Sequence, residues 1–129
     1  MPRSHVLVAA THALVGVLLV VGIWGALPAR WWPVDVIGTA LATTSLAGAV
    51  GLLSRRAWGL VLARLASWCL LVGGCVTCTA LALSVAHLWG MYGPVGSGGA
   101  LLLGTVAALI LPYLVGIPML QLRWLANRP

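Results

Sequence analysis

Residues 65–92 read LASWCLLVGGCVTCTALALSVAHLWGMY, a run that contains no Asp, Glu, Lys or Arg. A hydrocarbon layer about 30 Å thick is crossed by about 20 helical residues, because each residue adds about 1.5 Å. Lipid offers no hydrogen bonds to the backbone, so a segment that crosses it must satisfy its own N–H and C=O groups as a helix. The run therefore predicts a transmembrane helix over residues 65–90.

Three further stretches have the same character, and they cover residues 6–27, 36–53 and 100–122. The whole chain is 62% hydrophobic and only 6% charged, whereas a soluble domain carries about 25% charged residues. A soluble fold of 129 residues could not bury so much apolar surface, because small folds keep a large share of their surface exposed. We expect an all-α integral membrane bundle of four transmembrane helices that forms one domain over residues 1–129.

The connections between these stretches are short. Residues 93–99 are rich in Gly and Pro and predict a turn, and residues 54–64 predict a helix that resumes at Ala57. The first stretch is longer than the apolar core of about 7–15 residues found in signal peptides, which favours an uncleaved helix. No connection is long enough to hold a soluble domain.

The formal charge of +6 comes from seven Arg without any Lys, against a single acid, Asp35. The Arg are scattered between apolar runs, whereas nucleic-acid binding needs basic residues gathered on one face, so we expect no nucleic-acid partner. Cytoplasmic segments of membrane proteins are enriched in Arg and Lys. We therefore expect both termini to lie in the cytoplasm, a threading that leaves only Arg30 outside. The Arg expected on the cytoplasmic side are then Arg3, Arg55, Arg56, Arg64, Arg123 and Arg128.

Small residues one helical turn apart allow membrane helices to approach closely. We expect such positions to pack helices together within the chain or, alternatively, against another chain. The positions predicted for helix packing are Gly38, Ala42, Ala47, Gly51, Gly74 and Gly104.

Cys75 and Cys78 lie on one face of the third span, and thiolates bind soft metals such as Cu(I). No cluster of further Cys or Met residues provides an entry site, so packing as small apolar residues is preferred, with a metal relay as the alternative. His12 and His87 fall near opposite sides of the membrane in the proposed threading, which disfavours a shared haem. We therefore expect no cofactor and no metal.

Pro112 and Pro118 interrupt the fourth span, because each removes a helix hydrogen bond. Broken membrane helices line substrate sites in some transporters, but a kink that fits the helix to its neighbours is the simpler interpretation. Both positions are predicted to be hinges.

The chain has few side chains that could serve as a general acid or base, because it contains no Glu, one Asp and three separated His. We expect a non-catalytic accessory or structural subunit that acts through helix–helix contacts, in a homo-oligomer or a larger membrane complex. The alternative is a small transporter or channel for a lipophilic or soft-metal solute, and a third hypothesis is a lipid-modifying enzyme that uses His12 and Arg64. The heavy use of Ala, Val, Leu, Gly and Arg suggests a GC-rich bacterial genome, hence a multi-pass protein of the bacterial inner membrane.

Overall fold

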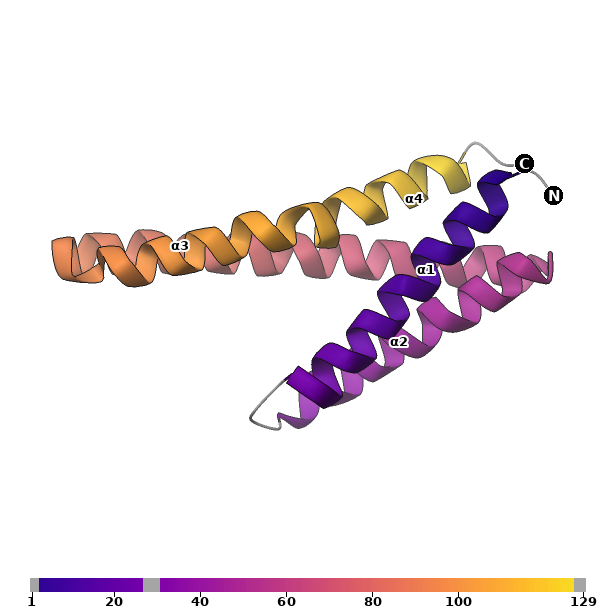
Figure 1. Ribbon diagram of the computed structural model, residues 1–129, viewed down its shortest axis with the longest axis horizontal. Helices are drawn as coiled ribbons and strands as arrows, with labels where there is room; N and C mark the ends of the chain where they lie inside the picture. The colour runs from indigo at the N-terminus through magenta and orange to yellow at the C-terminus, as the bar shows by residue number, and fades with distance from the viewer. Residues whose placement is uncertain (1–2, 27–30, 127–129) are drawn as a thin grey trace. The chain divides into compact units, whose positions relative to one another are not determined.

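The computed structural model describes residues 3–26 and 31–126, and every regular element within these ranges is helical. This confirms the all-α prediction. Two short π-helical segments, η1 and η2, continue the α-helices beside them. The elements in chain order are α1 (Arg3–Val21), η1 (Gly22–Ala26), α2 (Trp32–Leu53), α3 (Ala57–Leu111), η2 (Pro112–Gly116) and α4 (Ile117–Ala126), as labelled for the α-helices in Figure 1.

Three helical stretches are long and apolar enough to cross a membrane, namely His5–Gly25, Trp32–Leu53 and Ala57–Ala126. The first two, of 21 and 22 residues, are each suited to a single crossing. The third has 70 residues and contains both of the remaining expected spans, residues 65–90 and 100–122. These lengths and compositions indicate a membrane protein.

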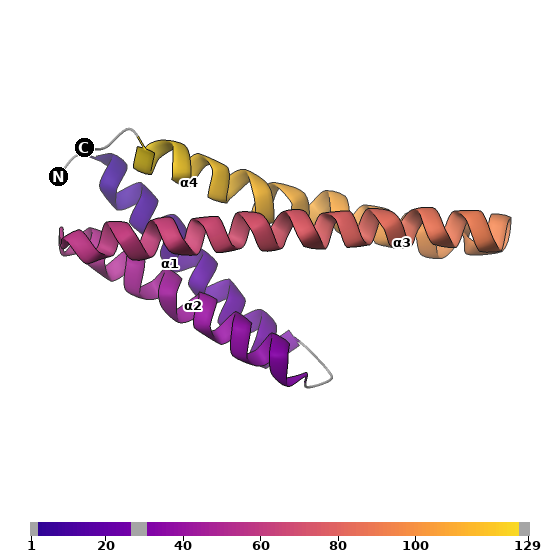
Figure 2. The same cartoon turned by 180° about the vertical axis from the view of Figure 1, so that it is seen from behind.

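The long helix α3 is broken at Gly93, whose φ of 51° and ψ of −131° are not helical. Glycine reaches a positive φ without the steric cost that a Cβ brings, and Pro94 suits the start of the next helical segment. A Cβ added at Gly74 would lie 2.5 Å from the carbonyl oxygen of Leu114, although a straight helix would separate these residues by about 60 Å. The chain therefore folds back at Gly93, as Figure 2 shows from behind.

Two expected boundaries need correction. Only Gly93 leaves helical φ and ψ within α3, so residues 94–99 are helical and the predicted loop is reduced to one residue. In addition, α2 begins at Trp32, four residues before the predicted span. Pro33 is tolerated in the first helical turn, and the carboxylate of Asp35 interacts favourably with the helix dipole there.

The chain divides into two compact units. Unit 1 comprises residues 1–69 and 121–129, and unit 2 comprises residues 70–120. Within unit 1, α1 and α2 lie side by side and run in opposite directions (Figure 1). Gly16 allows this approach, because a Cβ there would lie 2.6 Å from the Cγ of Leu46.

A tight corner joins α2 to α3 in unit 1. The backbones of Gly51 and Gly59 touch, so a Cβ on either residue would meet the backbone of the other. Arg55 lies just past the C-cap of α2 and has a φ of 53°. Its N–H donates to the carbonyl of Leu52 at 3.2 Å, and the N–H of Arg56 donates to the carbonyl of Gly51 at 3.0 Å. These two bonds form a Schellman motif, which satisfies carbonyls at the helix end. The start of α3 agrees with the prediction.

The apolar core of unit 1 draws on all four labelled α-helices. It ties the start of α1 to the end of α2, the start of α3 and the end of α4, and Leu60 and Trp124 pack against it. Its buried members are Val8, Ala9, Leu52, Ala63 and Leu125.

Candidate functional site

Three polar side chains inside unit 1 join three helices. Gln121 Nε2 donates to Thr11 Oγ1 at 3.0 Å, and Ser67 Oγ donates to Gln121 Oε1 at 3.1 Å. Thr11 in turn donates to the carbonyl of Val8 at 2.8 Å. Gln121 is 3% exposed and Ser67 is 0% exposed. We term Thr11, Ser67 and Gln121 the polar bridge, since its central amide links α4 to both α1 and α3.

The polar bridge is suited to holding helices together. Hydrogen bonds between membrane helices contribute about 0.6 kcal/mol on average and at most about 1.7 kcal/mol each. Its two hydroxyls and its amide are uncharged and do not titrate near neutral pH, so the group offers no acid–base chemistry. The bridge therefore specifies which helix faces meet.

A second set of buried polar side chains lies in α1 and α2. His12 and Ser45 are both 0% exposed. The two ring nitrogens of His12 and the Oγ of Ser45 have no hydrogen-bond partner among the described residues. A buried polar group without a partner costs about 1–3 kcal/mol. Replacement of either side chain by an apolar one would therefore break no hydrogen bond to the described residues.

The arginines predicted to orient the chain gather at one end of unit 1. The guanidinium of Arg64 donates through Nη2 to the carbonyl of Leu125 at 2.7 Å, which joins the start of α3 to the end of α4. The ring of His5 meets that of Trp124 edge-on, with ring centroids 5.0 Å apart. We term this surface the basic end; its exposed cations are Arg55, Arg56, Arg64 and Arg123.

The acid is placed differently from these four arginines. Asp35, the only acid of the chain, lies in the first turn of α2, at the opposite end of that helix from Arg55. Arg128 falls outside the described residues. The basic end therefore carries cations without a carboxylate on the adjoining helix turns.

Most of the predicted packing residues lie at close helix contacts. A Cβ added at Gly38 would meet the side chain of Ile23, and Gly51 and Gly74 touch Gly59 and Leu114 as described above. Ala42 is 0% exposed, and Ala47 is half-buried.

Gly104 behaves differently from the other predicted packing residues. A Cβ added there would meet nothing within 4 Å, and Ala108, one turn further along the same face, is exposed. The Cβ position of residue 104 therefore faces open space within unit 2.

The thiol pair and the second histidine are accessible. Cys75 is exposed and Cys78 is half-buried, and no three His, Cys, Asp or Glu side chains within residues 3–26 and 31–126 are grouped to hold a metal ion. His87 is exposed, in contrast to His12. Whether the two thiols act only in packing stays a prediction.

The predicted hinge coincides with a π-helical segment. Pro112 begins η2, and the N–H of Ile117 donates to the carbonyl of Pro112, five residues back. Pro118 follows in the first turn of α4 and is buried. Inserted π turns mark functional sites in many helices, but motion at this position stays a prediction.

The polar bridge was missed by reasoning from the sequence. Gln121 is the only Gln in the chain and follows a long apolar run, and that isolation was the available signal. Its partners Thr11 and Ser67 carry no such mark, because Ser and Thr are common in membrane helices. Comparisons add no assignment, because no family model, curated protein or solved structure matches the chain.

Proposed function

We propose that the chain crosses the bacterial inner membrane four times, with both termini in the cytoplasm. The break at Gly93 divides residues 57–126 into two legs, and each leg is long enough to cross about 30 Å of hydrocarbon. The gathering of arginines at the basic end supports a cytoplasmic location for that end, because cytoplasmic segments are enriched in Arg. The exposed Trp24, Trp31 and Trp32 mark the other end of the α1–α2 hairpin, as interfacial aromatic residues do.

Within this arrangement the chain acts as a non-catalytic subunit that binds another membrane helix through unit 2. The observation that carries this proposal is the difference in glycine packing between the units. In unit 1 the space beside three glycines at helix crossings is filled, because Gly16, Gly48 and Gly51 each contact a neighbouring helix. In unit 2 Gly74 and Gly96 are also in close contact, but five helical glycines have nothing within 4 Å of an added Cβ, whereas in the described part of unit 1 only Gly22 does. The five are Gly73, Gly90, Gly98, Gly104 and Gly116.

The hydroxyl groups of unit 2 support the same conclusion. Thr77, Thr79 and Thr105 each donate to the carbonyl four residues earlier on their own helix, at 2.8 Å. All three are exposed, so each hydroxyl oxygen can still accept a hydrogen bond from another helix, as Thr11 does in the polar bridge. In the most apolar window of residues 57–126, only 6% of residues are buried, against 33% in each of the first two stretches. Membrane helices associate through small residues and polar groups of this kind, so unit 2 has surface left for a partner.

The experiment that tests this proposal is co-purification in mild detergent with matched variants. Gly104→Leu fills the open small-residue face, whereas Val106→Leu enlarges a side chain about 200° further around the same helix. We expect the native chain to purify with a second copy or another membrane protein, Gly104→Leu to lose that association, and Val106→Leu to retain it. Purification of the native chain as a lone monomer, or equal behaviour of the two variants, would contradict the proposal.

A further inference from the structure

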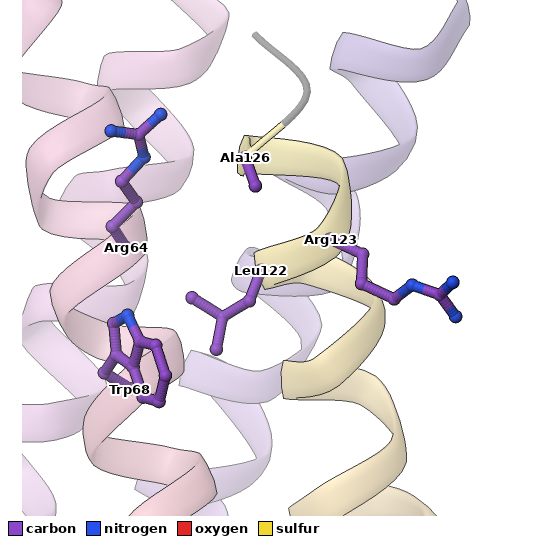
Figure 3. A pocket seen from close by; sticks show the side chains of 5 residues that line it. All are labelled: Arg64, Trp68, Leu122, Arg123 and Ala126. Carbon is purple, nitrogen blue, oxygen red and sulfur yellow. The ribbon is translucent and has the colours of Figure 1, made fainter.

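A groove opens at the basic end of unit 1, between the start of α3 and the end of α4. It has a volume of about 530 Å³. Its lining includes Arg64 and Trp68 on α3 and Leu122 and Ala126 on α4, and Figure 3 shows the side chain of Leu122 directed toward α3. Arg123 also lines the groove, but its guanidinium is directed away from Arg64 (Figure 3).

The groove is polar at its outer end and apolar further in. Arg64 and Trp68 are four residues apart on one helix, so they share a face and are separated by about 6 Å along the axis. The indole of Trp68 is 57% exposed and lies further from the helix ends than the guanidinium does (Figure 3). Leu122 faces the groove from the other wall, so a cation stands above an apolar slot.

The cation is held in place and keeps donors for a ligand. One nitrogen of Arg64, Nη2, donates to the carbonyl of Leu125 at 2.7 Å. A guanidinium has five N–H donors. This bond uses one of them and holds the guanidinium in place, so four donors remain for a ligand. Arg56 and Arg123 add positive charge at the same end, and Asp35, the only acid, lies in the first turn of α2. The surroundings therefore favour an anion.

We propose that this groove binds one anionic phospholipid, with the phosphate at Arg64 and an acyl chain along Trp68 and Leu122. Charge complementarity selects the headgroup, because guanidinium groups form strong charge-assisted hydrogen bonds with phosphate oxygens. This choice of ligand rests on the proposed membrane crossing, which places the groove where the helices end and lipid headgroups begin, so that a lipid is favoured over a soluble anion. The exposed indole beside an apolar wall is an arrangement typical of this interface.

The test uses the purified full-length chain in mild detergent and native mass spectrometry, with dioleoyl phosphatidylglycerol as the probe and dioleoyl phosphatidylcholine as its uncharged comparison. Arg64→Gln removes the proposed phosphate contact. Arg56→Gln removes the same charge from the same end without touching the groove. Trp68→Ala removes an exposed groove wall and leaves the cation in place.

We expect the native chain to bind phosphatidylglycerol in preference to phosphatidylcholine. Arg64→Gln should weaken this binding about tenfold more than Arg56→Gln does, which is the effect of losing one hydrogen bond to a charged group. Trp68→Ala should also weaken phosphatidylglycerol binding. If Arg64→Gln fails to fold, as shown by loss of its helical circular dichroism signal, Trp68→Ala takes its place as the test of the groove. Equal weakening by Arg64→Gln and Arg56→Gln, unchanged binding in Trp68→Ala, or displacement of the lipid by millimolar inorganic phosphate would overturn the proposal.

Discussion

Replacing Gln121 by Leu removes the amide that links three helices in unit 1. The two hydrogen bonds lost, to Thr11 at 3.0 Å and from Ser67 at 3.1 Å, together correspond to about 1–3 kcal/mol in a membrane protein. The loss should fall in the lower half of this range. Thr11 keeps its bond to the carbonyl of Val8, and a Ser hydroxyl in a helix can turn to a carbonyl of the preceding turn.

Unfolding of the purified chain by dodecyl sulfate in mixed micelles, followed by circular dichroism, measures this change. Gln121→Leu should lower the free energy of unfolding by about 1–2 kcal/mol. A cycle with Ser67→Ala should show a coupling energy of about 1 kcal/mol, because the two side chains share a bond. Thr105→Val is the control, since that hydroxyl bonds only to its own helix and its loss should change little. A stabilising Gln121→Leu, or additive effects in the cycle, would refute the assignment of the bridge.

Three further predictions concern single positions in the same unfolding assay. Arg55→Gly should stabilise the chain by about 1 kcal/mol, because the Cβ of a non-glycine residue is sterically strained at a φ of 53°. Arg55→Ala keeps the Cβ and should not stabilise the chain, so equal effects of the two variants would contradict this explanation. His12→Leu should stabilise the chain by about 1–3 kcal/mol, since it replaces a buried side chain whose ring nitrogens have no partner; a loss of stability would show that the imidazole has a bonding role. Gly51→Ala should destabilise the chain by about 1–3 kcal/mol, because the new Cβ would meet Gly59. Gly104→Ala, which meets nothing within 4 Å, should be neutral or favourable, and similar losses at both glycines would be inconsistent with the packing described.

The helices could be predicted from the sequence because lipid imposes a simple rule on them. A long apolar run must satisfy its own backbone, and this rule located the helical stretches that are long and apolar enough to cross a membrane. The start of α3 at Ala57 also agrees with the prediction. It failed at boundaries where polar residues continue a helix. Asp35 and the Trp residues before it read as a loop on hydropathy alone, yet α2 begins at Trp32.

The contacts between distant segments could not be predicted in the same way. Thr11 and Gln121 are linked by a hydrogen bond, although they lie in the first and last helices, and no local pattern pairs them. The small-residue rule identified Gly38, Gly51 and Gly74 as close-contact positions, because a glycine face permits approach from any side. The same rule could not tell that Gly104 faces open space, since periodicity does not show which faces the chain itself occupies.

The proposed role of unit 2 as a contact surface is tested most directly by photocrosslinking in native membranes. A photoreactive side chain is placed at position 104, on the open small-residue face, and in a second variant at position 109, about 140° further around the helix, where Leu109 is 72% exposed. The account predicts a discrete protein adduct from position 104 and only lipid adducts from position 109. Lipid adducts alone from position 104, or the same protein adduct from both positions, would contradict it.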